Sequence, residues 1–144
     1  MADPISIAAF TMTLVGVALK IGEGAGKFLE ETKGIDANIR DFRETIRNLY
    51  AALRNVARTL EQHPTQLPFE REHHQDIYRI LKSCSSTLER LRLALPELAP
   101  NPGPIERARA NLQATLKTSV VRDLVSHITS YTQVLQLSLI TLSL

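Results

Sequence analysis

The opening stretch, residues 1–19, is the feature of this sequence that most constrains its fold, because it has no charged residue between Asp3 and Lys20. Asp3 can cap the free backbone N–H groups of a helix start, and Pro4 suits the first helical position. The large apolar side chains that follow project around most of a helix; they are Ile5, Ile7, Phe10, Met12, Leu14, Val15, Val17 and Leu19. A helix that is apolar on all sides must be buried in a protein or in lipid.

Two other interpretations of this stretch are a secretory signal peptide and a transmembrane span. A signal peptide has a basic start and a small-residue cleavage site, whereas this chain starts with Asp3 and follows the apolar stretch with Lys20. The uncharged part, Pro4 to Leu19, has 16 residues. As a helix it reaches about 24 Å, against about 30 Å of bilayer hydrocarbon. We therefore expect this helix to be buried within the protein in its resting state.

Three glycines, Gly22, Gly24 and Gly26, follow at alternate positions. Each glycine inside a helix costs up to about 1 kcal/mol relative to alanine, so the segment is expected to act as a hinge or to admit another backbone closely. A phosphate-binding loop is a poorer interpretation, because no strand precedes the glycines and no Lys-Ser/Thr pair follows them. If the segment is a hinge, a Gly24→Ala change is expected to stiffen it and to stabilise the resting fold.

Apolar residues then recur at steps of three and four in two stretches, which a proline-containing break at residues 63–68 separates. The first set is Ile39, Phe42, Ile46, Leu49, Leu53, Val56 and Leu60; the second is Ile77, Leu81, Cys84, Leu88, Leu91, Leu95 and Leu98. Such a pattern predicts an antiparallel helical hairpin over residues 36–95 with left-handed bundle packing. Cys84 lies on the second stripe, so we expect a buried small hydrophobe rather than a reactive thiol.

After a proline-rich loop, residues 105–144 are expected to form a helix or a broken helix. One side carries an apolar stripe, which consists of Ala108, Leu112, Leu116, Val120, Leu124 and Ile128, widened by Val121 and Val125. No Lys, Arg, Asp or Glu follows Asp123. We expect this uncharged end to pack against the uncharged opening helix, with the charged hairpin outside. A strand over Ser138–Leu144 is a minor alternative, because apolar residues alternate there.

These elements predict one all-α domain of 144 residues, a bundle of four to five helices with a buried N-terminal hydrophobic helix. Its parts are an apolar helix with a glycine joint (1–33), the helical hairpin (36–95) and the C-terminal helix (105–144). A net charge of +2 without a block of like charge argues against a nucleic-acid partner, and the single cysteine indicates a reducing, cytoplasmic location. The apolar C-terminal end suggests that the domain is the N-terminal part of a larger protein.

The search for catalytic or ligand-binding residues finds little. His73 and His74 are adjacent at the expected exposed start of a helix and point to different sides, which does not suit one metal ion. His127 is expected to be a satisfied, half-buried residue of the last helix. No Ser-His-Asp spacing, Cys-His pair or apolar carboxylate pair is recognisable. We therefore expect no enzyme activity, no metal and no cofactor.

Four segments together resemble a known family: Met1–Ala9, Asp41–Leu53, Leu81–Leu91 and Tyr131–Leu139. They resemble the fungal N-terminal domain of STAND and NLR-like receptors, which is related to the HeLo and HeLo-like cell-death domains. The resemblance implies an all-helical module at the start of a receptor with a nucleotide-binding switch and repeats. In HeLo-type relatives the N-terminal helix becomes exposed on activation and attacks membranes. Here that role would fall on the eight large apolar residues between Ile5 and Leu19.

Two functions remain open at the level of sequence. The first is a signalling or programmed cell-death effector module that self-associates and inserts its N-terminal helix into membrane lipid. Its balanced charge argues against strong attraction to anionic lipid. The second is a non-enzymatic interaction module that dimerises or docks partner helices and has no membrane activity.

Overall fold

The computed structural model of the protein describes residues 3–30, 36–62 and 68–143, and all of its long elements there are helices. The helices are α1 (Pro4–Glu30), α2 (Ala37–Gln62), α3 (Pro68–Ala94), α4 (Ile105–Leu116) and α5 (Ser119–Ser143), with a short 3-10 helix, η1 (Pro96–Leu98). The predicted all-α bundle of four to five helices with an apolar N-terminal helix is confirmed. Residues 1–2, 31–35, 63–67 and 144 lie outside the described chain.

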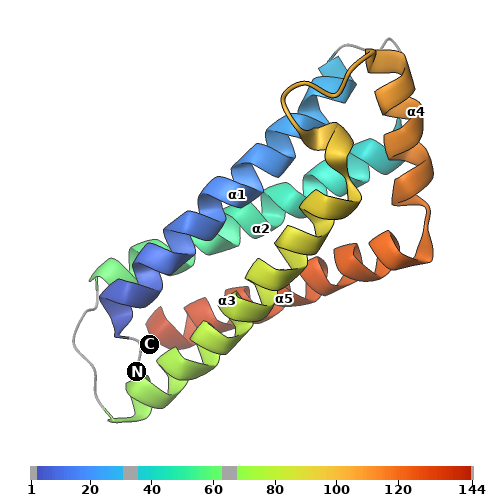
Figure 1. Ribbon diagram of the computed structural model, residues 1–144. Coiled ribbons are helices and arrows are strands. Elements are labelled where there is room, and N and C mark those ends of the chain that lie inside the picture. The colour runs from blue at the N-terminus through green and yellow to red at the C-terminus, as the bar shows by residue number, and fades with distance from the viewer. Residues whose placement is uncertain (1–2, 31–35, 63–67, 144) are drawn as a thin grey trace.

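Four long helices form an elongated bundle, and α4 closes one end of it (Figure 1). α2 runs antiparallel to α1, and α3 then returns in the direction of α1. α5 packs against both α2 and α3. The labelled N- and C-terminal ends lie at the same end of the bundle, opposite α4.

Both apolar stripes of the predicted hairpin are buried in the common core, but α2 and α3 do not pack closely against each other: α2 packs mainly on α1 and α5, and α3 packs mainly on α5 and α1. All seven residues of the first stripe are buried in α2, and the second stripe is buried from Ile77 to Leu95, while Leu98 is partly buried. Burying a large apolar side chain contributes about 1.5–3 kcal/mol, so these stripes supply much of the driving force for folding. The step of three and four residues was therefore a sound guide to the buried side of α2 and α3.

The arrangement of α1 and α5, the two helices that contain the long uncharged segments, differs from the prediction. α1 packs chiefly against α2 and also contacts α3 and η1, whereas α5 packs against α2 and α3 (Figure 1). α1 and α5 therefore lie diagonally across the bundle from one another, and so do α2 and α3. The expected central pairing of α1 with α5 was wrong, because the apolar stripes of α2 and α3 are wide enough to serve both neighbours.

The last stretch is broken between α4 and α5 at Lys117 and Thr118. The Thr118 hydroxyl donates to the Thr115 carbonyl oxygen at 2.7 Å, and its oxygen accepts from the Val121 backbone N–H at 3.4 Å, so Thr118 ends one helix and caps the next. The break shifts the apolar register by one residue. Val121 is buried and Val120 is 59% exposed, so the placement of Val120 on the inner stripe was wrong. Residues 138–143 are helical, which also overturns the alternative of a strand.

Candidate functional site

α1 continues well beyond its last uncharged residue. It has 27 residues, which corresponds to a length of about 40 Å. Within the described residues, Pro4–Leu29 is the one stretch of helix long and apolar enough to cross a membrane. A core helix of a soluble protein meets the same criterion, so the two faces of α1 decide what the helix is suited for.

The inner face of α1 is packed into the bundle. Three of the eight large apolar residues named above, Ile7, Leu14 and Val15, are buried, and the same face continues with Ala18, Ile21, Ala25 and Phe28. Phe10 is half-buried and meets Tyr78 of α3 edge to face, with 5.7 Å between ring centroids. Thr11 is fully buried, and its hydroxyl donates to the Ile7 carbonyl at 2.7 Å, which satisfies the polar group within the helix.

From Pro4 to Leu19 the outer face of α1 is uncharged and largely apolar, with Ser6 and Thr13 as its polar residues, and it is open to solvent. Ile5 is 64% exposed, Met12 47% and Leu19 43%. Ala9 and Gly16 lie between them, also exposed. We refer to these five residues as the outer stripe. The burial expected from the sequence therefore holds for one side of α1 only, since α2 and α3 cover the inner face and the outer stripe has no cover within the described chain.

The start of α1 is capped as expected. A carboxylate oxygen of Asp3 accepts a hydrogen bond from the Ser6 backbone N–H at 2.7 Å. This hydrogen bond lowers the pKa of the exposed Asp3 carboxyl below its usual value, because it stabilises the charged form. Pro4 takes the first helical position, where its missing N–H costs nothing.

The glycine segment lies inside the unbroken helix, where each glycine has a different neighbour. A Cβ at Gly24 would collide with the backbone carbonyl of Leu98 in η1, whereas one at Gly22 would lie 3.8 Å from the Ile46 side chain. A Cβ at Gly26 would lie 3.3 Å from the Arg43 guanidinium. Gly24 is therefore the position that admits another backbone, as one of the sequence interpretations expected. A hinge role for Gly22, Gly24 and Gly26 stays a prediction.

A second contact fastens the same part of α1 to the proline-rich segment. The Lys27 ammonium group donates to the Pro100 carbonyl oxygen at 2.8 Å. Together with the approach of Leu98 to Gly24, this hydrogen bond holds the last turns of α1 against residues 96–100. The first turns of α1 have no comparable polar contact to another described helix.

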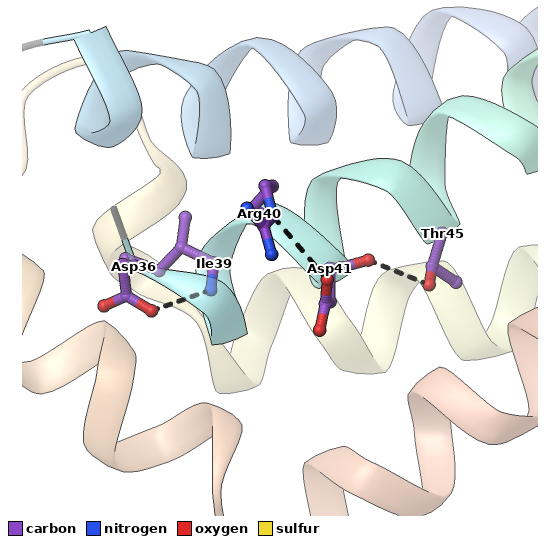
Figure 2. A network of polar contacts seen from close by, with 5 residues as sticks. All are labelled: Asp36, Ile39, Arg40, Asp41 and Thr45. Carbon is purple, nitrogen blue, oxygen red and sulfur yellow. Dashed lines mark hydrogen bonds and ion pairs between the residues drawn. The ribbon is translucent and has the colours of Figure 1, made fainter. Parts of the chain in front are cut away.

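Figure 2 shows the start of α2 and a polar group that sequence reasoning missed. Asp36 is buried, and its Oδ1 accepts from the Ile39 backbone N–H at 3.1 Å, which caps the helix. Its other oxygen, Oδ2, is also buried and has no hydrogen-bond partner among the described residues. Asp36 was expected only as the place where the second helix begins. Its burial depends on packing that the local sequence does not show.

The remaining candidate residues lie apart from one another. His74 is buried, which corrects the expectation that both adjacent histidines are exposed, while His73 is half-buried with its Nε2 at 3.5 Å from the Ser138 carbonyl oxygen. His127 is exposed rather than half-buried, and its ring lies 6.3 Å from that of Tyr131. Cys84 is buried, as expected, and burial raises its pKa to about 12. The described residues contain no group of three His, Cys, Asp or Glu suited to a metal ion.

A surface depression with a volume of about 340 Å³ lies between α2 and the start of α5. Its apolar wall is made by Phe42, Leu116 and Val125. Its charged groups, Asp41 and Arg122, are both exposed, so their interaction with a ligand is screened by water. Because its apolar wall is small and its charges are screened, this depression is a weaker candidate for a binding site than the exposed apolar face of α1.

Comparison with known proteins gives no match: no family model, no curated protein and no solved structure is significantly similar to this chain.

Proposed function

We propose that this chain is a non-enzymatic signalling module of the cell-death effector kind, which acts by inserting α1 into membrane lipid after self-association. The observation that carries the proposal is that α1 has no charge from Pro4 to Leu19 and exposes the large apolar side chains of Ile5, Met12 and Leu19 in addition to its buried apolar face. A helix that serves only as a wall of a bundle needs one apolar side, and its other side is normally polar. The outer stripe is of no use to the isolated fold.

The energetics of insertion favour α1 over its main packing partner α2. Detaching α1 exposes the buried side chains of Ile7, Leu14, Ile21 and Phe28, each of which costs about 1.5–3 kcal/mol in water. In hydrocarbon the cost for the α1 side chains is recovered, and the outer stripe gains burial that it does not have in the resting bundle, whereas the apolar faces of α2 and α3 that α1 uncovers remain a cost against insertion. α2 lacks this advantage because its exposed side carries many charges, among them Arg40, Asp41 and Glu44.

Polar groups set the depth that α1 can reach. Lys20 and Glu23 are exposed in the middle of the helix, and Lys27 follows one turn later. A charge at the bilayer centre is costly, so these groups are expected to stay at the lipid–water interface. We therefore expect insertion of residues 4–19, with the later turns of α1 lying in the headgroup region.

The test uses the fact that the chain contains no tryptophan. A Met12→Trp variant carries one fluorophore on the outer stripe, and a Leu93→Trp variant carries one on α3 at a position that is 74% exposed. Self-association is imposed through a chemically inducible dimeriser fused after residue 144, with phosphatidylcholine–phosphatidylserine vesicles present. Insertion predicts that brominated lipid quenches the Met12→Trp signal and leaves the Leu93→Trp signal unchanged.

Leakage of an entrapped dye measures the consequence. Met12→Glu leaves the buried face untouched but places a charge on the inserted segment, so leakage is expected to fall at least tenfold. Leu93→Glu makes the same change on α3 and is expected to leak like the unmodified chain. Equal leakage from both variants, or no quenching under imposed association, contradicts the proposal. The latter result favours the interaction module without membrane activity.

A further inference from the structure

We infer that the outer stripe of α1 is a docking surface for a second copy of this chain, with the two α1 helices antiparallel. The inference concerns the resting protein in solution and does not depend on membrane insertion. It starts from the outer stripe, whose members Ile5, Ala9, Met12, Gly16 and Leu19 follow at steps of four, three, four and three residues and are all exposed. This is the spacing of a helix–helix contact seam.

Large and small residues alternate along the outer stripe, and this alternation makes it complementary to its own reverse. In an antiparallel pair, Ile5 of one chain lies over Gly16 of the other, and Met12 lies over Ala9. A twofold axis repeats both contacts, as in other symmetric dimers. A parallel pair instead places large residues on large ones and small residues on small ones, which packs two straight helices poorly.

Gly16 gives an independent reason to expect a partner. A Cβ at Gly16 would have no atom within 4 Å, so nothing in the fold of one chain explains a glycine there. Gly24 differs, because the Leu98 carbonyl occupies the place of its side chain. Glycine weakens the middle of a helix, and its use at an exposed site is explained if another backbone or side chain approaches closely.

The charges of α1 favour the same orientation. Asp3 lies at one end of the outer stripe and Lys20 at the other, and both are exposed. Within the described residues Lys20 forms no ion pair, since the three pairs found join residues of α2 and of α3. Antiparallel docking brings the Asp3 end of one helix beside the Lys20 end of the other, whereas parallel docking brings like charges together.

The size of this surface sets the strength of the dimer. From Ile5 to Leu19 the outer stripe is about 21 Å long, so one helix pair buries less than the roughly 1,200–2,000 Å² of a standard stable interface. We therefore expect a weak dimer, whose population changes with concentration in the micromolar range. Sedimentation should show an average mass that rises from the 16.1 kDa of one chain toward twice that value.

A Gly16→Leu variant tests the surface without harming the fold. A Cβ at residue 16 meets no atom of the described chain within 4 Å, and leucine favours helix more than glycine does, so the variant is expected to unfold at the same or a higher temperature. It blocks the approach of Ile5 from the second copy and should weaken dimerisation at least tenfold. Leu93→Glu changes an exposed apolar residue on α3 and should leave the dimer unchanged. A folded Gly16→Leu protein that dimerises as before, or an unmodified chain that stays monomeric up to millimolar concentration, overturns the inference.

Disulfide trapping tests the orientation. Ile5→Cys and Gly16→Cys proteins with different tags are mixed and oxidised; antiparallel docking predicts a mixed disulfide dimer and little cross-linking of Ile5→Cys alone. In that variant the two thiols are separated by about 16 Å along the axis. Cys84 is buried, so the unmodified chain is the negative control. Cross-linking of Ile5→Cys with itself, without the mixed product, shows parallel pairing and contradicts the inference.

Vesicle experiments separate this inference from the proposed function. Gly16→Leu adds apolar area to the outer stripe, so it removes the dimer but does not lower the affinity of α1 for lipid. A monomeric Gly16→Leu protein that still inserts under imposed association supports both ideas. If Gly16→Leu dimerises as before and still inserts, the proposed dimer surface is wrong and the membrane function stands. If Gly16→Leu is monomeric and the unmodified chain never inserts, the membrane function is wrong and the dimer surface stands.

Discussion

The backbone carbonyl of Leu98 occupies the place where a side chain at Gly24 would lie. A methyl group there must push η1 away from α1, because a backbone carbonyl cannot turn aside as a flexible side chain does. The expected gain in helix propensity from Gly24→Ala, up to about 1 kcal/mol, is therefore smaller than the packing penalty of about 1–3 kcal/mol. This reverses the stabilisation that the sequence alone suggested.

We predict that Gly24→Ala lowers the free energy of unfolding by about 1 kcal/mol, measured by urea denaturation. Gly16→Ala is the matched control, because it makes the same substitution in the same helix where the Cβ meets nothing within 4 Å. At a concentration low enough for the monomer, it should raise the stability by up to about 1 kcal/mol. Stabilisation by both substitutions would show that η1 moves aside without cost.

Lys27→Met should loosen the proline-rich segment. The methionine keeps the length of the side chain but loses the hydrogen bond to the Pro100 carbonyl, so the stability is expected to fall by about 0.5–1.5 kcal/mol. Amide exchange near residues 96–101 should become faster, while exchange in the middle of α2 stays unchanged. Lys20→Met is the control, because Lys20 is exposed and makes no such contact within the described chain. Unchanged exchange in the Lys27 variant would mean that the apolar packing of Leu98 holds the segment alone.

One carboxylate oxygen of Asp36 caps α2, and the other is buried without a hydrogen-bond partner among the described residues. Asp36→Ser keeps an oxygen that can accept from the Ile39 N–H and removes the second oxygen, so we expect stability equal to or above that of the unmodified chain. Asp36→Ala removes the cap as well and should cost about 0.5–2 kcal/mol. Thermal unfolding of the two variants gives the comparison. A serine variant as unstable as the alanine variant would indicate that Oδ2 has a bound water or another partner.

Cys84 should be inert in the folded protein. Burial raises its pKa from 9.0 to about 12, so the reactive thiolate is scarce at pH 8. A thiol reagent is therefore expected to modify Cys84 at the rate of unfolding rather than at the rate of a free cysteine. Because the folded-state pKa is the higher one, this contribution to stability is present below pH 9 and is lost as the pH rises from 9 toward 12. Rapid modification at pH 8 without unfolding contradicts the burial of the thiol.

The sequence predicted which side of α2 and α3 is buried, because each is a regular helix with a repeat of three and four residues. The same reasoning failed at Val120, where a two-residue break shifts the register and turns Val121 inward. It also placed α1 against α5, since each contains a long segment without charged residues. Neighbour choice depends on the width and shape of the stripes on all four helices, which the residue types of two segments do not show.

The candidate site was predicted in part. The eight apolar residues of α1 were identified from their lack of charge, but their division into Ile7, Leu14 and Val15 inside and Ile5, Met12 and Leu19 outside needed the bundle. Gly16 was not singled out, because a lone glycine in a helix has no evident meaning until its surroundings are known. Asp36 is a similar case: its role as a helix cap follows from the local sequence, whereas its burial depends on the packing of distant helices.

Leu98 lies against Gly24, and the Pro100 carbonyl accepts a hydrogen bond from Lys27. Because both contacts lie near the C-terminal end of α1, the force needed to detach α1 depends on which end is pulled. If α1 is pulled from its Pro4 end, only apolar contacts resist the pull. These contacts break one turn at a time, so the force needed at each step is low. If it is pulled from its Glu30 end, the close packing of the Leu98 carbonyl on Gly24 and the hydrogen bond of Lys27 must break together, which requires a higher force. Under mechanical load, α1 is thus expected to detach stepwise at low force from its Pro4 end and abruptly at a higher force from its Glu30 end.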